Sequence, residues 1–170
     1  LYAGRGLSTY IGVSAWFFAI AALPLAEAVA LHFTLPIIGL ILSAVVLREH
    51  ITRARWMAVV VGFGGVLIIL RPGGEAFDIM ALVVLLSAAG YASGDIFTKL
   101  LSRTEPVRLI VVNLNIYLIA FAAIPTALNW HTPPASDIPM ILVMGVTAWA
   151  AHMCLAQAMK RADASVIIPM

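Results

Sequence analysis

The chain has 170 residues, of which 63% are hydrophobic and 11% are charged, and its formal net charge is +2. A soluble domain carries about a quarter charged residues, so this composition excludes a water-solvated globule and suits helices that face lipid. The small net charge argues against nucleic acid as a partner, and the single cysteine, Cys154, excludes an intrachain disulfide.

Six apolar runs are long enough, or nearly so, to cross a bilayer about 30 Å thick, which needs about 20 helical residues. In chain order they cover about 7–23, 26–47, 56–70, 79–98, 109–128 and 138–159. The runs are continuous rather than alternating, and a spanning segment must satisfy its own backbone hydrogen bonds, which favours helices. The predicted fold class is therefore all-α: a polytopic membrane bundle of six transmembrane helices.

Basic residues gather on alternate loops between these runs. Nine of the ten lie before the first run, between the second and third, between the fourth and fifth, or after the sixth: Arg5, Arg48, Arg53, Arg55, Lys99, Arg103, Arg108, Lys160 and Arg161. Only Arg71 lies on the other side. Because basic loops remain in the cytoplasm, the pattern predicts a multi-pass protein of the inner (plasma) membrane with these loops cytoplasmic.

A short repeat relates the first run to the last. Residues 19–28 and 155–164 each end a run in small residues, cross a short turn and restart with Ala-acid-Ala, at Glu27 and Asp163. The offset is 136 residues and contains five runs, an odd number, so the two copies cross the membrane in opposite directions. The second turn is basic and the first is not, which agrees with opposite sides. Inverted repeats of this kind are typical of secondary transporters.

A longer series of residues resembles a known family. From Phe18 the chain reads Phe-Ala-Ile-Ala-Ala-Leu-Pro-Leu-Ala-Glu-Ala, followed by Phe33-Thr34-Leu35-Pro36, Leu47-Arg48-Glu49, Arg55-Trp56, Gly62-Phe63-Gly64-Gly65 and Arg71-Pro72-Gly73. This series resembles the EamA domain of the drug/metabolite transporter superfamily. The second half of the chain, which ends in Ala162-Asp163-Ala164-Ser165 and Pro169, is similar to the beginning of that family's second EamA copy.

The resemblance implies a ten-helix transporter made of two inverted five-helix repeats. Residues 1–72 would be the C-terminal part of the first repeat, with three helices. Residues 77–170 would be the N-terminal part of the second, with three helices and the start of a fourth. The chain opens without a methionine and ends as a new apolar run begins. We therefore expect a fragment, whose residues alone do not complete the central cavity.

The second run carries the first group of predicted solute-binding residues. Pro36 has no N–H, so the carbonyl of His32 loses its helical partner, and a kink, a free acceptor and an imidazole fall together near the bilayer midplane. Transporter sites are often built at interrupted helices, which makes His32, Thr34 and Pro36 predicted binding residues. The alternative is a packing kink in which Thr34 or a neighbouring helix satisfies the freed carbonyl.

The sixth run carries a second predicted group. His152 lies mid-span near Trp149 and Gln157, and the offset of 136 residues pairs it with Trp16 in the first run. An aromatic ring and an imidazole at repeat-related positions would suit opposite walls of a central cavity, shared with His32. The alternative is a histidine bonded across helices, beside tryptophans that face lipid.

Other polar residues have local interpretations. Asp95 stands four residues before Lys99, so a pair on one helix face is favoured, and Tyr91, one turn earlier, is a predicted binding residue on the same surface. Glu49 is interpreted as a member of a charge network with the arginines of its own loop. The Gly90-x-x-x-Gly94 pair predicts close helix approach.

These features predict a secondary-active transporter, exporter or importer, of small metabolites and amino-acid-like or drug-like solutes, and not an enzyme. A membrane-embedded enzyme and a non-catalytic membrane subunit are the alternatives. The sequence holds no His-Glu-x-x-His motif, and its four histidines are too scattered to indicate a metal site. The expected partners are the solute and the lipid bilayer, with a homodimer left open; no cofactor or metal is expected.

Overall fold

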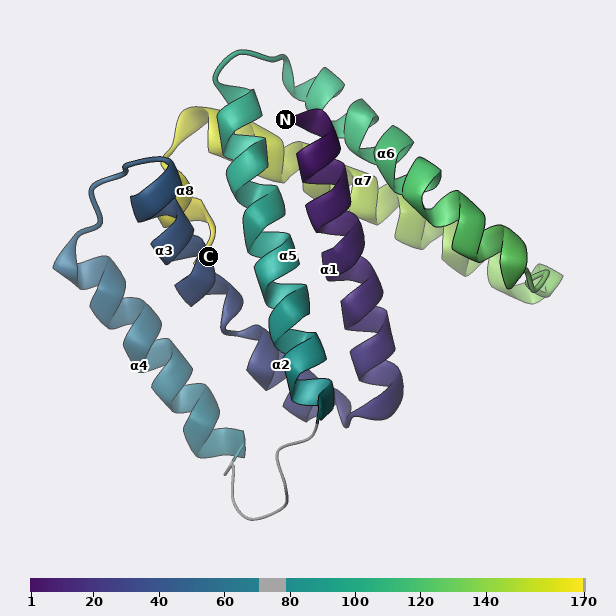
Figure 1. Ribbon diagram of the computed structural model, residues 1–170, viewed down its shortest axis with the longest axis horizontal. Helices are drawn as coiled ribbons and strands as arrows, with labels where there is room; N and C mark the ends of the chain where they lie inside the picture. Colours follow the sequence, from purple (N-terminus) through teal and green to yellow (C-terminus); the bar gives the residue numbers. More distant parts are fainter. Residues whose placement is uncertain (71–78, 170) are drawn as a thin grey trace.

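The computed structural model describes residues 1–70 and 79–169, and every regular element within them is helical (Figure 1). In chain order these are α1 (Tyr2–Ala22), α2 (Leu25–His32), α3 (Leu35–Val46), α4 (Arg53–Leu70), α5 (Ile79–Ser102), α6 (Val107–Leu128), the 3-10 turn η1 (Ala135–Asp137), α7 (Ile138–Arg161) and α8 (Ala164–Ile167). The all-α prediction is confirmed for this part of the chain.

Four segments are long and apolar enough to cross a membrane: Leu25–Val46, Ile79–Ser102, Val107–Leu128 and Ala135–Arg161. The first of them contains both α2 and α3. The two remaining predicted runs are also helical, as α1 and α4. The described residues therefore hold four candidate spans, and the predicted count of six is not confirmed.

The segments that carry most of the basic residues lie toward one end of the bundle (Figure 1). They are the start of the chain, the α3–α4 connection, the α5–α6 connection and the α7–α8 turn; we call this the basic end. The α1–α2 turn lies at the opposite end. This arrangement agrees with the predicted alternation of loops, while the side of the membrane that the basic end faces stays a prediction.

Small residues determine how closely α1 packs along α5, which runs through the middle of the bundle (Figure 1). A Cβ on Gly90 would lie only 2.7 Å from the backbone nitrogen of Gly12, and a Cβ on Gly94 only 2.7 Å from the hydroxyl of Thr9. The Ser87 hydroxyl adds a 2.8 Å hydrogen bond to the Gly12 carbonyl. The close approach predicted at Gly90 and Gly94 is confirmed.

Two turns in the bundle share one backbone shape. The α1–α2 turn consists of Leu23 (φ −109°, ψ 152°) and Pro24 (φ −55°, ψ 132°). The α7–α8 turn consists of Ala162 (φ −140°, ψ 165°) and Asp163 (φ −66°, ψ 145°). The two turns lie at opposite ends of the bundle (Figure 1), as an inverted repeat requires.

Matching the two turns shifts the register of the predicted repeat by three residues. α1 ends at Ala22 and α7 at Arg161, so equivalent residues are 139 apart (161 − 22) rather than 136. Glu27 is then in the first turn of α2, whereas Asp163 is the N-cap of α8. Carboxylates are favoured at both positions by free N–H groups and the helix dipole. This shared preference is why the Ala-acid-Ala pattern aligned residues that are not equivalent.

The prediction that Arg5 lies in a loop before the first span is wrong. It belongs to α1, is only 2% exposed, and donates from Nε to the Thr98 hydroxyl of α5 (2.7 Å) and from Nη1 to the Ile110 carbonyl of α6 (2.6 Å). Thr98 in turn donates to the Gly94 carbonyl (2.8 Å). A buried guanidinium is tolerated only with such partners, so Arg5 ties three helices together at the basic end.

Candidate solute-binding site

The second span is interrupted where the sequence places Pro36. α2 ends at His32 and α3 begins at Leu35, with Pro36 in its first turn. Between them, the Thr34 N–H donates to the Leu31 carbonyl, three residues back, at 3.1 Å. A tight 3-10-type turn thus replaces the α-helical ladder, because proline cannot donate to it. The predicted interruption is confirmed.

The interruption presents His32 to aromatic rings from two other helices. Its ring centroid lies 4.7 Å from that of Trp16 on α1, at an interplanar angle of 57°, and 5.5 Å from that of Tyr91 on α5, at 84°. The α1–α5 contact sets this arrangement, since Trp16 is one turn beyond Gly12 and Tyr91 directly follows Gly90. Three of the predicted binding residues therefore form one cluster, which we call the aromatic triad.

His32 carries a polar atom that the described residues leave unsatisfied. Its Nε2 is buried without a hydrogen-bond partner, a property shared among the described side chains only by Ser43 Oγ. An unpaired buried donor or acceptor costs about 1–3 kcal/mol. A polar ligand that entered the triad would remove this cost by bonding to Nε2.

Thr34 and Pro36 shape the interruption. The Thr34 hydroxyl donates to the Leu31 carbonyl at 2.8 Å. The packing-kink alternative assigns this hydroxyl to the freed carbonyl of His32; the structure directs it to Leu31 instead. Thr34 thus stabilises the turn that positions His32.

An apolar cluster borders the triad on the side of the α1–α2 turn. Its buried members are Ala19, Leu23, Ala28 and Val84, and Trp16 packs against them. Trp16 is therefore partly buried against this cluster and also forms a wall of the triad.

The predicted residues of α7 lie apart from the triad. Among the described residues, the ring contacts of the triad do not extend to Trp149, which is 50% exposed, or to half-buried His152. The corrected register also pairs Trp16 with Leu155 rather than His152, which removes the repeat-based reason for placing Trp16 and His152 on opposite walls. A cavity shared by α2 and α7 stays a prediction.

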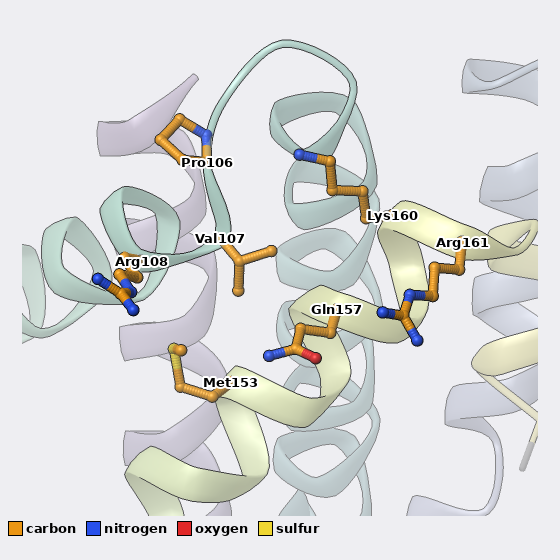
Figure 2. A pocket seen from close by; sticks show the side chains of 7 residues that line it. All are labelled: Pro106, Val107, Arg108, Met153, Gln157, Lys160 and Arg161. Carbon is orange, nitrogen blue, oxygen red and sulfur yellow. The ribbon is translucent and has the colours of Figure 1, made fainter.

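Gln157 lines a separate hollow at the basic end, with a volume of about 430 Å³ (Figure 2). Residues from the start of α6 and the end of α7 form it: Pro106, Val107, Arg108, Met153, Gln157, Lys160 and Arg161. The Lys160 and Arg161 side chains leave α7 in different directions (Figure 2), so the cations do not converge on one point. The hollow is a basic surface feature, distinct from the triad.

Asp95 and Lys99 do not make the predicted pair. Lys99 Nζ donates to the carbonyls of Met159 (2.9 Å) and Ala162 (2.6 Å) at the end of α7. Asp95 interacts electrostatically with Arg5 of α1 instead. The physical reason is that the last carbonyls of a helix lack intrahelical partners and attract a cation, which outweighs a pair along one helix.

Glu49 also departs from its predicted network. Its Oε1 and Oε2 accept hydrogen bonds from the backbone N–H groups of Ala164 and Ser165, each at 2.9 Å. Burial opposes ionisation of Glu49, but these bonds, the Ser165 hydroxyl and the charge of Lys99 together hold its pKa below the ordinary value. The partner lies 115 residues away in the chain, where no local pattern could indicate it.

The family and the relatives that this chain matches are named as transporters. Residues 2–71 match the EamA-like transporter family. The S-adenosylmethionine uptake transporter of Rickettsia bellii is 29% identical, over 97% of this chain and 57% of its own length. The riboflavin transporter of Vibrio cholerae is 32% identical, over 94% and 54%. The pseudopaline exporter CntI of Pseudomonas aeruginosa is 30% identical, over 96% and 58%.

The chain thus spans about half the length of the curated relatives that it matches. A solved crystal structure is also similar, with a TM-score of 0.76 and 20% identity, over 99% of this chain and 61% of that one. At that identity the likeness establishes the fold alone. The family match and the named relatives confirm the resemblance that the sequence indicated.

Proposed function

We propose that this chain, whose residues 2–71 belong to the EamA-like transporter family, forms the central helices of a secondary-active transporter of small metabolites. In this proposal residues 1–72 and 77–170 are parts of two inverted repeats and supply six transmembrane helices of ten. The basic end faces the cytoplasm, and the membrane is the plasma (inner) membrane. Relatives are named for both uptake and export, so the proposal includes both directions.

The observation that carries the proposal is the unpartnered Nε2 of His32 within the aromatic triad. Polar groups inside a membrane bundle are costly and mark solute or ion paths by default. Interrupted helices are the usual sites of solute contact in secondary transporters, and His32 is the last residue before such an interruption. A passing solute would supply the missing hydrogen bond.

The triad favours a planar solute with polar edges. Stacking on an aromatic ring contributes about 1–3 kcal/mol, and a hydrogen bond about 1 kcal/mol. S-adenosylmethionine and riboflavin, for which two relatives are named, both contain a planar nitrogen heterocycle. We infer that the solute of this protein carries a ring of the same kind, sandwiched near Trp16 and Tyr91.

The residues of α7 complete the proposed path. Trp149 and His152 are proposed to line the wall opposite the triad, with Gln157 nearer the basic end. Half-buried His152 would supply an imidazole to this wall. Thr34 and Pro36 would contribute through the shape of the interrupted helix.

Transport of radiolabelled riboflavin, S-adenosylmethionine and a panel of aromatic metabolites into proteoliposomes tests the proposal with the full-length protein. Each triad substitution has a neighbouring control on the same segment. Trp16→Ala is compared with Phe17→Ala, and His32→Ala with Phe33→Ala; both control phenylalanines are more than half exposed, at 56% and 52%. Loss of about 1.4 kcal/mol of solute binding corresponds to about a tenfold loss of uptake at low solute concentration.

We expect that tenfold loss in the two triad variants and less than a twofold change in the two controls. Thermal unfolding of each variant separates loss of solute contact from loss of folding. Equal losses in Trp16→Ala and Phe17→Ala at equal stability would assign the triad to packing. No saturable uptake of any panel member would contradict the proposed function itself.

A further inference from the structure

The α7–α8 turn is held at the basic end by side chains from three other segments. Glu49, in the α3–α4 connection, accepts the N–H groups of Ala164 and Ser165 at 2.9 Å each. Arg55, in the first turn of α4, donates from Nη1 to the Ser165 hydroxyl at 2.6 Å. Lys99 of α5 holds the other side of the turn through the Met159 and Ala162 carbonyls.

These bonds match the electrostatics of the two helix ends that meet at the turn. The N–H groups at the start of α8 have no intrahelical acceptor and carry partial positive charge, which an anion satisfies. The carbonyls at the end of α7 carry partial negative charge, which a cation satisfies. Glu49 and Lys99 therefore bind the two sides of one turn with opposite charges, and Arg55 adds a third attachment. We call Glu49, Arg55 and Lys99 the clasp.

An apolar plug lies beneath the clasp. Its buried residues come from α3, α5, α7 and α8 and their ends: Leu47, Ile96, Met159, Ala164 and Ile168. Ile168 contacts α3 at Gly39, where a Cβ would overlap the isoleucine side chain. While the clasp is made, α8 is seated on α3 and the plug closes the space between the four helices.

Through Glu49 and Arg55 the clasp also joins the two predicted repeats, at the end where Arg5 makes its buried bonds between them. Glu49 and Arg55 belong to the segment 1–72, and the α7–α8 turn belongs to the segment 77–170. Alternating access requires two such parts to separate at one end and close at the other. Contacts that must open repeatedly need to be few and replaceable by water. A carboxylate and two N–H groups meet this need, because both sides are readily hydrated once parted.

We propose that Glu49 is a gating residue, and that the clasp it forms with Arg55 and Lys99 keeps the basic end of the transport path shut until Glu49 releases α8. The proposal rests on the proposed transport function. In the clasped state the path is closed at the basic end; release of α8 lifts Ile168 from Gly39 and opens the plug.

The accessibility of a cysteine in the plug tests the gate without any transport assay. Ile168→Cys is introduced into the full-length protein in nanodiscs, with Cys154→Ser removing the native exposed thiol. Glu49→Gln removes the anionic acceptor, and the matched control is Asp163→Asn. Asp163 is the N-cap of the same helix and makes no side-chain capping bond. Alkylation of position 168 by a water-soluble maleimide is then timed.

We expect alkylation at position 168 to be about tenfold faster with Glu49→Gln, because labelling follows the population of the open form. With Asp163→Asn it should change less than twofold. A second pair, Arg55→Gln against exposed Arg53→Gln, gives the same comparison if Glu49→Gln does not fold. Equal alkylation rates in the variant and its control, in both pairs, would contradict the proposed gate.

A reversible cross-link tests the gate by its effect on solute uptake. Cysteines replace Glu49 and Ser165 and are joined by a short bifunctional thiosulfonate, which fixes α8 to the α3–α4 connection. Joining should abolish solute uptake, and reductant should restore it. Full uptake by the joined protein would refute the gate while leaving transport established. Failure of the native full-length protein to transport would count against the proposed function, and the alkylation rates at position 168 would still test the clasp.

Discussion

α1 and α7 hold equivalent places in the two proposed repeats, but their surroundings differ. Gly6 and Gly145 are 139 residues apart and therefore correspond. A Cβ on Gly6 would overlap the Tyr117 side chain of α6, whereas a Cβ on Gly145 would meet no described atom within 4 Å. Within the part of the chain that the structure describes, α1 makes close backbone contacts along its length, while the buried residues of α7 lie near its end.

The turns that follow these helices differ in the same way. The α1–α2 turn inserts Leu23 into the apolar cluster that contains Ala28, while Pro24 is exposed. The α7–α8 turn is bonded by Glu49 and Lys99. Both turns thus adjoin an apolar cluster, and the α7–α8 turn is in addition bonded by charged side chains.

The largest effect should come from breaking the α1–α5 contact. Gly90→Ala places a Cβ 2.7–2.8 Å from backbone atoms of Gly12, which cannot yield without separating the helices. We expect a loss of about 3 kcal/mol in the free energy of unfolding of this chain in detergent micelles. The control, Gly145→Ala on α7, should change it by less than about 1 kcal/mol. Equal losses in the two variants would show that α1 and α7 do not differ in how closely they are packed.

Substitution of Arg5 should cause the second-largest loss of unfolding free energy. Arg5→Gln removes the donor to the Ile110 carbonyl and the bond to Thr98, leaving buried groups unpaired. The expected cost is about 2 kcal/mol of unfolding free energy, measured by denaturant titration. Arg53→Gln, at an exposed position of α4, is the control and should stay within about 0.5 kcal/mol. A cost below the control's would mean that Arg5 is not a structural tie.

The contribution of Glu49 to the free energy of unfolding should depend on pH. Because its pKa is lower in the folded chain than the ordinary value near 4.5, its stabilisation is complete above that value and is lost as pH falls through the lowered pKa. Glu49→Gln should cost about 1 kcal/mol at pH 7, and the difference from the native chain should shrink at pH 3. Unfolding at both pH values measures this; a difference independent of pH would contradict it.

The smallest effect concerns Arg48, the one described non-glycine residue with positive φ, at 55°. L-residues pay about 1 kcal/mol in this left-handed region, and glycine does not. Arg48→Gly should therefore raise the unfolding free energy by up to about 1 kcal/mol. Arg48→Ala, which removes the charge but keeps the Cβ, should give no gain. A gain in both variants would assign the effect to charge rather than backbone conformation.

Some of this structure could be predicted from residue type and spacing. Pro36 predicted the interruption after His32, because a missing N–H has a fixed local consequence. Gly90 and Gly94 predicted close packing for the same kind of reason. The sequence also placed Trp16 and Tyr91 among the binding residues, although the contact of both with His32 depends on the packing of three helices.

The contacts that were missed are long-range. Lys99 has an acid four residues away, so a local rule favours that pair, but its actual acceptors are 60 and 63 residues distant. In the sequence Arg5 resembles a charge in a loop, whereas in the fold it is buried against α5 and α6. The repeat register slipped because a carboxylate fits two positions at a helix start, as Glu27 and Asp163 show. Charged side chains with long reach are placed by tertiary structure, which local patterns do not contain.

Protection of the interrupted helix by solute tests the central claim most directly. Thr34→Cys in the Cys154→Ser background of the full-length protein is alkylated with and without saturating transported solute, and Thr104→Cys in the α5–α6 connection is the exposed control. We expect solute to slow alkylation at position 34 about tenfold or more and to leave position 104 unchanged. Equal alkylation of position 34 with and without a solute that the protein demonstrably transports would place the binding site elsewhere.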